Sequence, residues 1–353
     1  MNEPSHDERS VRIDKLQRLR KTGIEPYPSH VNRTHKLSEA LDQFESLSAA
    51  GTEVSLAGRI RLLRRHGGLS FARIEDDGGV IQLLLSKKGL GESPYALTKE
   101  LDLADFISAS GKLILSKTGE KTLEVSSWQL ISKAILPLPE KWHGLKNEEE
   151  RYRHRYLDLI VNPEVRDFFR LRSKFISSMR AFLTKQGFME VETPVLEHVP
   201  GGAEAEPFIT HHNTLDVDLY LRISLELHLK RLIVGGYEKI FEIGKVFRNE
   251  GMSTQHLQEF TEMEFYWAYA DNEKLMQLVQ ELYQTVIKET FGSLKITCRD
   301  IELDFSGNWP KYDYSQLVLD HAGIDLKAIE TATQLQKAIK SAKIKLDIDP
   351  KAG

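Results

Sequence analysis

Three side chains of different chemistry, Arg248, Phe260 and Glu264, lie within one short stretch of the sequence. An arginine guanidinium can bind a phosphate or a carboxylate through two parallel hydrogen bonds. A phenylalanine ring can stack on a flat ring, and a glutamate can hold a cation. Together these side chains could bind one molecule that carries groups of all three kinds.

The elements that must position these residues are two strands. Residues 240–247 and 260–266 are apolar and aromatic, and residues 249–258 contain the Gly, Ser and Asn typical of an irregular connection. The pattern predicts an antiparallel hairpin. Alternate residues of a strand face the same side, so Phe260, Glu262, Glu264 and Tyr266 would share one surface. The alternative is a solvated hairpin in which the arginine and the glutamates are placed by chance.

Composition restricts the class of protein. The chain has 353 residues, of which 41% are hydrophobic and 28% charged, which predicts a soluble protein of two or three domains. The single cysteine, Cys298, and the lack of zinc-type Cys/His spacing favour a reducing compartment. No signal-like or membrane-spanning stretch is present, so we expect a cytoplasmic location and no membrane partner. A net charge of -4 means that RNA contacts must come from local basic patches.

A change to period-two alternation predicts a β-barrel over residues 52–135. The strands are expected at 54–62, 70–74, 80–86, 106–116 and 122–131, with a helix at 95–103 between the third and the fourth. Five strands and one helix are typical of the OB arrangement. Four arginines, together with Phe71 and Gln82, would suit single-stranded RNA, although Phe71 could instead be a core residue. The arginines are Arg59, Arg61, Arg64 and Arg65.

The rest of the chain reads mainly as helices. Residues 1–10 predict a polar tail and residues 11–21 a short basic helix, which is either a solvated surface helix or an RNA contact. Residues 137–163 predict a linker that contains a basic hinge formed by Arg151, Arg153, His154 and Arg155. An apolar stripe predicts a helix over 164–186 that Gly187 closes. Further helices are expected at 271–290, 314–323 and 332–342.

The hairpin pattern resembles motif 2 of the class II aminoacyl-tRNA synthetases. It consists of Phe247-Arg248-x-Glu250, a loop, and His256-x-x-x-Phe260-x-x-x-Glu264. Residues 188–194 resemble motif 1, and residues 200–213 and 221–231 resemble the lysyl-tRNA synthetases in particular. The resemblance implies an α+β chain in which an N-terminal OB-fold β-barrel precedes an antiparallel-sheet catalytic domain that is incomplete here. The implied segments are an N-terminal extension at 1–50, an anticodon-binding domain at 51–136, a linker at 137–163 and a catalytic domain at 164–353.

The same resemblance assigns roles to individual residues. Arg248 would be the catalytic residue, bridging the lysine carboxylate and the α-phosphate. The ATP-binding residues would be Arg248, Glu250, His256 and Phe260. The lysine-binding residues would be Gly202, Glu226, Arg248, Glu264 and Tyr266. The anticodon-binding residues would be Arg64, Phe71 and Gln82, and Pro194 would lie at a homodimer interface. The implied partners are tRNA(Lys), L-lysine and ATP.

Two departures from the family pattern are expected to matter. Gln255 stands where the family usually has an arginine, and motif 3, with the acidic Mg²⁺ ligands near it, does not occur in these residues. We therefore expect no metal ligands in this chain, truncation before motif 3 and reduced or no activity alone. The alternatives are a non-catalytic tRNA-binding protein derived from a synthetase, or a sister aspartyl- or asparaginyl-tRNA synthetase.

Overall fold

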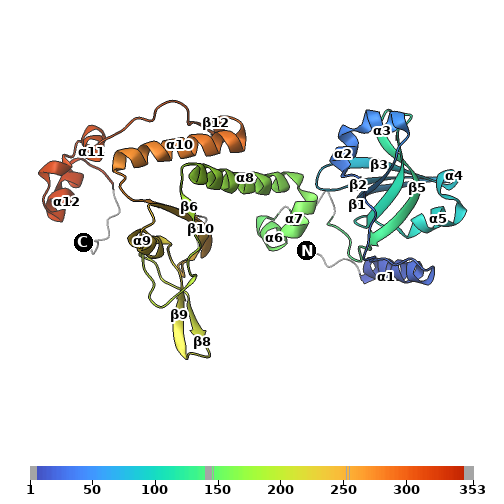
Figure 1. Ribbon diagram of the computed structural model, residues 1–353, viewed down its shortest axis with the longest axis horizontal. Helices are drawn as coiled ribbons and strands as arrows, with labels where there is room; N and C mark the ends of the chain where they lie inside the picture. The colour runs from blue at the N-terminus through green and yellow to red at the C-terminus, as the bar shows by residue number, and fades with distance from the viewer. Residues whose placement is uncertain (1–5, 140–144, 146, 252, 254, 346–353) are drawn as a thin grey trace. The chain divides into compact units, whose positions relative to one another are not determined.

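The chain divides into two compact units in the computed structural model, which describes residues 6–139, 145, 147–251, 253 and 255–345 (Figure 1). Residues 1–163 form the first unit and residues 164–353 the second. Helix α1 spans His6–Lys21, so the second half of the predicted tail is helical, and residues 1–5 lie outside the described residues. The final residues, 346–353, also lie outside them.

Five strands of the first unit close into a barrel in the order β1-β2-β3-β5-β4, as the alternation predicted (Figure 1). Their bounds are β1 Glu53–His66, β2 Leu69–Glu75, β3 Val80–Ser86, β4 Phe106–Leu115 and β5 Lys121–Ser132. Inward-facing side chains such as Leu56, Ile74 and Leu83 are fully buried in one apolar cluster. The neighbouring strands are antiparallel except for β3 and β5, whose parallel pairing closes the barrel.

Short helices surround the barrel, and one of them differs from its prediction. They are α2 Leu37–Asp42, α3 Phe44–Ala50, α4 Lys87–Leu90, α5 Glu92–Leu97 and the 3-10 helix η1 Thr98–Glu100. The helix predicted at 95–103 is wrong in position, because helical structure starts just after Ser86, whose hydroxyl caps the amide of Gly89. It ends at Glu100, since Leu101 is extended and buried.

Ion pairs and hydrogen bonds tie the basic helix α1 to the barrel. Arg18 pairs with Glu100 at 2.9 Å, and Lys15 pairs with Asp102. Arg12, which is 6% exposed, donates to the carbonyl of Leu103 at 3.0 Å. These cations therefore fix the helix to its own domain.

The segment predicted as a linker holds two short helices, α6 Glu148–Arg153 and α7 Arg155–Val161. Both are organised by the buried carboxylate of Asp158, which accepts hydrogen bonds from Arg151 at 2.8 Å and from Arg155. Two arginines of the predicted basic hinge thus bind a carboxylate within the unit. Residues 140–144 and 146 of this segment lie outside the described residues.

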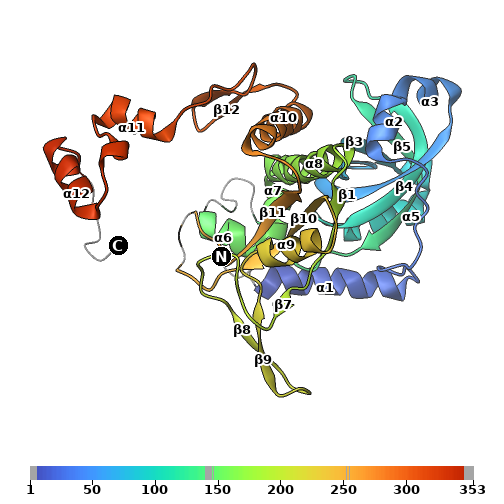
Figure 2. The same cartoon turned by 60° about the vertical axis from the view of Figure 1, so that its left-hand side comes forward.

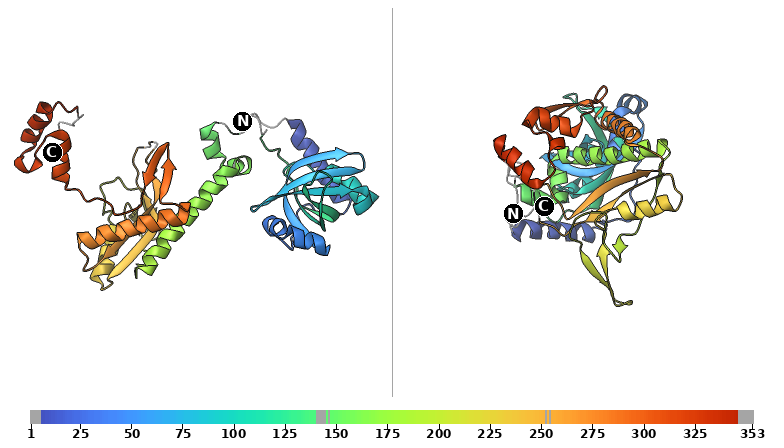
Figure 3. Two further views of the ribbon diagram at one scale, coloured as in Figure 1. Left: turned by 90° about the horizontal axis from the view of Figure 1, so that it is seen from above. Right: turned by 90° about the vertical axis from the view of Figure 1, so that its left-hand side faces the viewer.

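The centre of the second unit is a three-stranded sheet with the order β11-β10-β6. Its strands are β6 Met189–Glu190, β10 Lys239–Phe247 and β11 Glu259–Trp267. Strands β10 and β11 form the predicted antiparallel hairpin, whereas β6 pairs with β10 in parallel. Helices α8 Pro163–Lys185 and α10 Asn272–Phe291 pack on one face, and α9 Glu226–Val234 packs on the other (Figures 2 and 3).

Local signals explain the ends of the two long helices. Gly187 adopts a left-handed conformation with φ of +83° two residues after α8, as predicted. Asp271 caps α10 by accepting the amide hydrogen of Lys274 at 2.8 Å. The remaining elements of the unit are the strands β7 Leu196–Glu197, β8 Ile209–His212, β9 Val217–Leu221, β12 Lys295–Cys298 and β13 Ile301–Asp304, and the helices α11 Tyr314–Ala322, η2 Leu326–Ala328 and α12 Ala332–Ser341.

Candidate active site

The register of the β10–β11 hairpin decides which side chains share a surface. Met263, Phe265 and Trp267 pack into the apolar cluster beneath α8 and α10. Phe260 and Tyr266 pack with residues of α9 on the opposite face. The prediction that Phe260, Glu262, Glu264 and Tyr266 lie on one side of the sheet is therefore confirmed.

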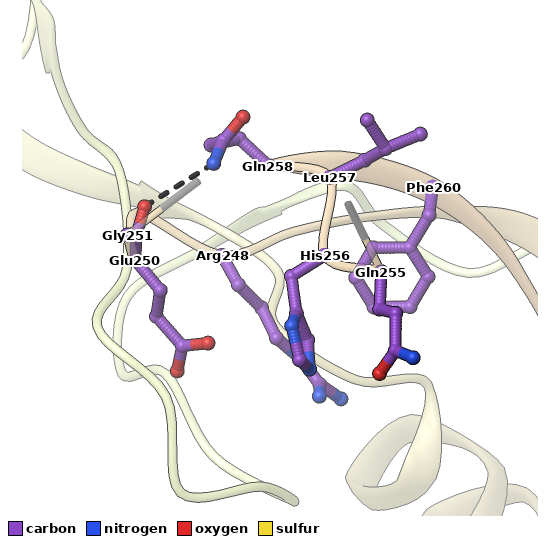
Figure 4. A pocket seen from close by; sticks show the side chains of 8 residues that line it. All are labelled: Arg248, Glu250, Gly251, Gln255, His256, Leu257, Gln258 and Phe260. Carbon is purple, nitrogen blue, oxygen red and sulfur yellow. Dashed lines mark hydrogen bonds between the residues drawn. The ribbon is translucent and has the colours of Figure 1, made fainter. Parts of the chain in front are cut away.

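A pocket of about 330 Å³ lies where this hairpin opens into its loop (Figure 4). It contains all four predicted ATP-binding residues, and the full lining is Arg248, Glu250, Gly251, Gln255, His256, Leu257, Gln258 and Phe260. The side chains of Arg248, Glu250 and His256 extend to the same side of the backbone, whereas Leu257 and Gln258 point the other way. The pocket thus presents a cation and an imidazole beside an aromatic ring.

Arg248 is held by three neighbours at once. Its Nε donates to the carbonyl oxygen of Ile223 at 3.1 Å, and its Nη2 lies 3.7 Å from Oε1 of Glu262. The guanidinium carbon lies 5.1 Å from the centre of the Phe260 ring. The side chain of Arg248 is 29% exposed, so part of the guanidinium remains open to a ligand. The guanidinium could therefore bind a phosphate or a carboxylate with little movement of Arg248.

Short local hydrogen bonds shape the loop between the strands. The hydroxyl of Ser253 accepts the amide hydrogens of Gln255 and His256, both at 3.1 Å, and its oxygen lies 2.7 Å from Nδ1 of His256. At the base of the loop the amide of Arg248 donates to the carbonyl of Gln258 at 2.9 Å. Gln255, the residue that departs from the family pattern, also lines the pocket.

Three hydrogen bonds hold the carboxylate of Glu264, one of the predicted lysine-binding residues. Its Oε1 accepts hydrogen bonds from the hydroxyl of Ser224 at 3.0 Å and from the amide of Leu225 at 3.2 Å. Its Oε2 accepts one from the hydroxyl of Tyr266 at 3.0 Å. The carboxylate is therefore fixed in place, and Oε2 keeps one lone pair for a further donor.

Glu226 and Gly202 lie beside the same serine. The amide of Glu226, the first residue of α9, donates to the hydroxyl of Ser224 at 3.0 Å, and its carboxylate pairs with Lys230 at 2.7 Å. Gly202 has φ of +88°, and an added Cβ would lie 2.9 Å from the Ser224 hydroxyl and 3.0 Å from Cβ of Glu226. Only glycine allows this close approach and this backbone conformation.

Negative charge is concentrated on this face. Burial raises the pKa of the Glu262 carboxyl above its ordinary value, and the neighbouring Glu264 raises it further. Burial and the charge of Glu264 also raise the pKa of the Tyr266 hydroxyl, which therefore keeps its proton. Such a site favours a ligand that brings positive charge, for example an ammonium group.

Sequence reasoning missed a buried polar network under the site. The guanidinium of Arg222 and the carboxylate of Glu242 form an ion pair at 2.6 Å, and Thr193 donates to the same carboxylate at 2.6 Å. Both charged side chains are only 3% exposed. The available signal was Glu242 itself, because a charged residue in the middle of an apolar strand needs a buried partner.

The predicted anticodon-binding residues lie together on the outside of the barrel. Arg64 of β1 is directly opposite Phe71 of β2, and Gln82 lies on the neighbouring strand β3. Phe71 is half-buried between the buried Ser70 and Ala72, so its ring is not an inner core residue. Gln82 donates to the hydroxyl of Thr122 at 3.0 Å, which leaves its amide oxygen available.

The other arginines that were predicted near this surface have partners within the domain. Arg61 pairs with Glu75 at 2.9 Å, and Arg65 donates to the carbonyl of Leu101 at 2.8 Å. Arg59 lies over the ring of Phe106 at 4.2 Å. Arg64, by contrast, makes no hydrogen bond or ion pair with any residue that the structure describes.

Comparison with known proteins agrees with the two candidate sites, the pocket of the second unit and the surface of the barrel. Residues 147–346 match the family described as tRNA synthetases class II (D, K and N), and residues 54–131 match the OB-fold nucleic acid binding domain. The lysine–tRNA ligase of Roseiflexus castenholzii is 48% identical over 341 residues, which are 96% of this chain and 70% of the relative. The chain belongs to the class II lysine–tRNA ligases. The lysine–tRNA ligases of Pelotomaculum thermopropionicum and Moorella thermoacetica are 47% and 44% identical, over 96% and 99% of this chain and 67% and 70% of their own lengths.

The two family matches contain all the candidate residues. Every predicted ATP- and lysine-binding residue lies within the class II match, and Arg64, Phe71 and Gln82 lie within the nucleic acid binding match. Among the described residues, no group of three or more His, Cys, Asp and Glu side chains could hold a metal ion. None of the helices in the described part of this lysine–tRNA ligase chain has the length and apolar character needed to cross a membrane.

Proposed function

We propose that this chain binds L-lysine and ATP, forms lysyl-adenylate, and transfers the lysyl group to tRNA(Lys). One observation carries the proposal. Glu264, held by three hydrogen bonds, lies on the same strand face as Phe260 and as Glu262, whose carboxylate pairs with Arg248. An ammonium-binding carboxylate, a ring for adenine and a cation for a phosphate are the three groups that lysine activation requires.

In the first step, a carboxylate oxygen of lysine attacks the α-phosphorus of ATP. A new oxygen–phosphorus bond forms as the bond between the α-phosphorus and pyrophosphate breaks, and the two electrons leave with pyrophosphate. Arg248 bridges the lysine carboxylate and the α-phosphate, so it stabilises the charge that develops there. Phe260 stacks on the adenine, His256 lies near the triphosphate, and Glu250 orients the nucleotide.

Recognition of lysine depends on two ammonium groups. Glu226 and the carbonyl of Gly202 bind the α-ammonium, and Glu264 and Tyr266 bind the ε-ammonium. A hydrogen bond to a charged group contributes about 1.5–3 kcal/mol, so a neutral amino acid loses that much and leaves a carboxylate unpaired. The same carboxylates oppose aspartate, which needs a cation for its side chain.

In the second step, the lysyl group moves from the adenylate to the 3′-terminal adenosine of tRNA(Lys), with Arg248 still at the phosphate. Arg64, Phe71 and Gln82 bind the anticodon. Mg²⁺ accompanies the ATP, but the described carboxylates do not form a donor set for it.

The chain acts as a homodimer in this proposal, with Pro194 at the subunit boundary. Pro194 is exposed, and β6, which lies just before it, is at the edge of the sheet. Large apolar side chains on α8 and just after Pro194 are also exposed, including Phe168 at 62% and Leu196 at 47%. A second copy could cover these side chains. Sedimentation equilibrium should give twice the chain mass, and Phe168→Glu should weaken the association.

The function is tested first by calorimetry with non-hydrolysable aminoacyl-sulfamoyl-adenosines. The lysyl compound should bind at least tenfold more tightly than the aspartyl and asparaginyl compounds. Preference for aspartyl or asparaginyl would indicate a sister synthetase. RNA binding without binding of any of the three would indicate a non-catalytic protein.

Aminoacylation is then compared between residues 1–353 and a version extended by the C-terminal part of a relative. Slow charging by residues 1–353 and normal charging by the extended version are expected, because several fixed cations must act on the triphosphate together. Near-equal turnover by the two proteins would contradict the assignment of the triphosphate site.

A further inference from the structure

Arg222 is a buried arginine that is not among the residues lining the pocket. Its Nη1 donates to Oε1 of Glu242 at 2.6 Å, to the carbonyl of Thr193 at 3.0 Å and to the Thr193 hydroxyl at 3.1 Å. Its Nε donates to the carbonyl of Lys245 at 2.8 Å. One guanidinium therefore joins the segment after β6 to the strand β10, which leads directly into Arg248.

The backbone at Arg222 continues this connection to the catalytic arginine. The carbonyl of Arg222 accepts the amide hydrogen of Phe247 at 2.9 Å, and the carbonyl of the next residue, Ile223, accepts Nε of Arg248 at 3.1 Å. Ile223 is only 2% exposed, so this carbonyl cannot exchange its partner for water. The position of Arg248 thus depends on a two-residue segment whose first side chain is Arg222.

Charge balance gives Arg222 a second effect on the site. Glu242 is directly opposite Glu264 in the β10–β11 register, and Gly244 is opposite Glu262. Three carboxylates are therefore close together on one face, and like charges placed opposite each other across strands destabilise a sheet. Arg222 pairs with Glu242, so the charge of Glu242 is balanced and does not add to the repulsion around Glu264.

The shape of the network requires arginine and not merely a positive charge. An added Cβ at Gly244 would lie 2.3 Å from Nη2 of Arg222, which shows that the planar guanidinium passes close over a bare backbone. A lysine ammonium is a single point of charge and cannot bond the Lys245 carbonyl, Thr193 and Glu242 in this planar arrangement.

We propose that Arg222 is a positioning residue that aims the guanidinium of Arg248 at the α-phosphate, through the Ile223 carbonyl and the β10 backbone. This inference rests on the proposed function, since it assigns Arg222 to the same reaction. It predicts that replacing Arg222 lowers the affinity for ligands that contact Arg248. The affinity for a ligand that only stacks on Phe260 should not change.

The test measures binding of two probes by calorimetry at one pH: lysyl-sulfamoyl-adenosine, whose sulfamate occupies the phosphate position, and adenosine alone. Arg222→Lys should weaken the first probe roughly tenfold to a hundredfold, the range of one charged hydrogen bond. It should change adenosine affinity by less than twofold. Arg231→Lys is the matched control, because Arg231 is an exposed arginine on α9, and it should change neither probe.

A double-mutant cycle separates positioning from a general loss of structure. If Arg222 acts through Arg248, Arg222→Lys combined with Arg248→Met should bind lysyl-sulfamoyl-adenosine no more weakly than Arg248→Met alone. Additive losses, or equal losses for adenosine, would overturn the inference. Failure of the unaltered chain to bind lysyl-sulfamoyl-adenosine would instead reject the proposed function, and the two failures are therefore distinguishable.

If Arg222→Lys does not fold, Thr193→Val provides the test. It removes one acceptor from Arg222 and one donor to Glu242 while keeping the volume of the side chain. A loss of affinity for lysyl-sulfamoyl-adenosine with unchanged adenosine affinity supports positioning. Unchanged affinity for both probes overturns it.

Discussion

Replacing Glu264 with glutamine removes one charge from the site with little change in shape. Oε1 of Glu264 already accepts two hydrogen bonds, from Ser224 and Leu225, whereas Oε2 accepts one, from Tyr266. In Glu264→Gln the amide oxygen must stay with the two donors, so the NH₂ group takes the place of Oε2. The Tyr266 hydroxyl can rotate and accept from this NH₂, and the fold should therefore be preserved.

The same exchange removes the acceptor proposed for the ε-ammonium of lysine. An NH₂ group offers no lone pair to an ammonium, so the complete charged hydrogen bond is lost, at about 1.5–3 kcal/mol. Lysine affinity should fall about tenfold to about 150-fold, because 1.4 kcal/mol corresponds to a factor of ten. Norleucine, which lacks the ammonium, should bind the glutamine variant no more weakly than it binds the original chain.

Calorimetric titration with lysine and norleucine measures both effects, after circular dichroism has shown that the variant is folded. Glu259→Gln is the matched control, because Glu259 is 58% exposed on the same strand and pairs with Lys245 at the surface. It should change lysine affinity by less than twofold. If Glu264→Gln binds lysine as tightly as the original chain, Glu264 is not the ammonium ligand and the reasoning is refuted.

Three further predictions concern the anticodon surface, the charge of the site and the core. Phe71→Ala should weaken binding of an anticodon stem-loop with UUU by about 1–3 kcal/mol, measured by fluorescence anisotropy at fixed salt, and equal binding of a GGG loop would contradict the assignment. The folded-state pKa of Glu262 is raised, so ionised Glu262 costs stability above that pKa, and this cost disappears as the pH falls toward the ordinary value of 4.5. Glu262→Gln should therefore raise the free energy of urea unfolding at pH 7.5 more than at pH 5, and a gain that is the same at both would refute this. Leu183→Ala should lower the free energy of unfolding by about 2–5 kcal/mol, since Leu183 is fully buried, whereas Leu257→Ala, at a side chain 69% exposed, should change it by less than about 0.5 kcal/mol.

The parts of the site that lie on a single strand could be predicted from the sequence, because alternation along the strand decides which side chains share a face. Alternation alone placed Phe260, Glu262, Glu264 and Tyr266 on one face, because a hairpin with an apolar underside has only one register that buries Met263, Phe265 and Trp267. The barrel was predictable for a similar reason. Apolar and polar residues alternate clearly along its strands, and segments that contain glycine separate the strands.

Features that depend on distant partners could not be predicted in this way. Arg222 and Glu242 are 20 positions apart and read singly as ordinary charged residues, and only the fold shows that they neutralise each other. The short helices after β3 begin at a serine cap that one hydroxyl supplies, and no run of apolar residues marks them. The partner of two linker arginines could not be predicted either, because Asp158 is an ordinary acidic residue in the sequence and only the fold shows that it is buried.

The parallel pairing of β6 with β10 has a consequence during synthesis on the ribosome. Met189 pairs with Ile240, so the first strand emerges about 50 residues before its partner, which at about 5–20 residues per second is a wait of about 3–10 seconds. During that time the apolar side chains of α8 have no sheet to cover, because β10, β11 and α10 have not yet been made. The nascent catalytic unit should therefore need protection by a chaperone at this stage, while the barrel, whose strands all precede it, can already be folded.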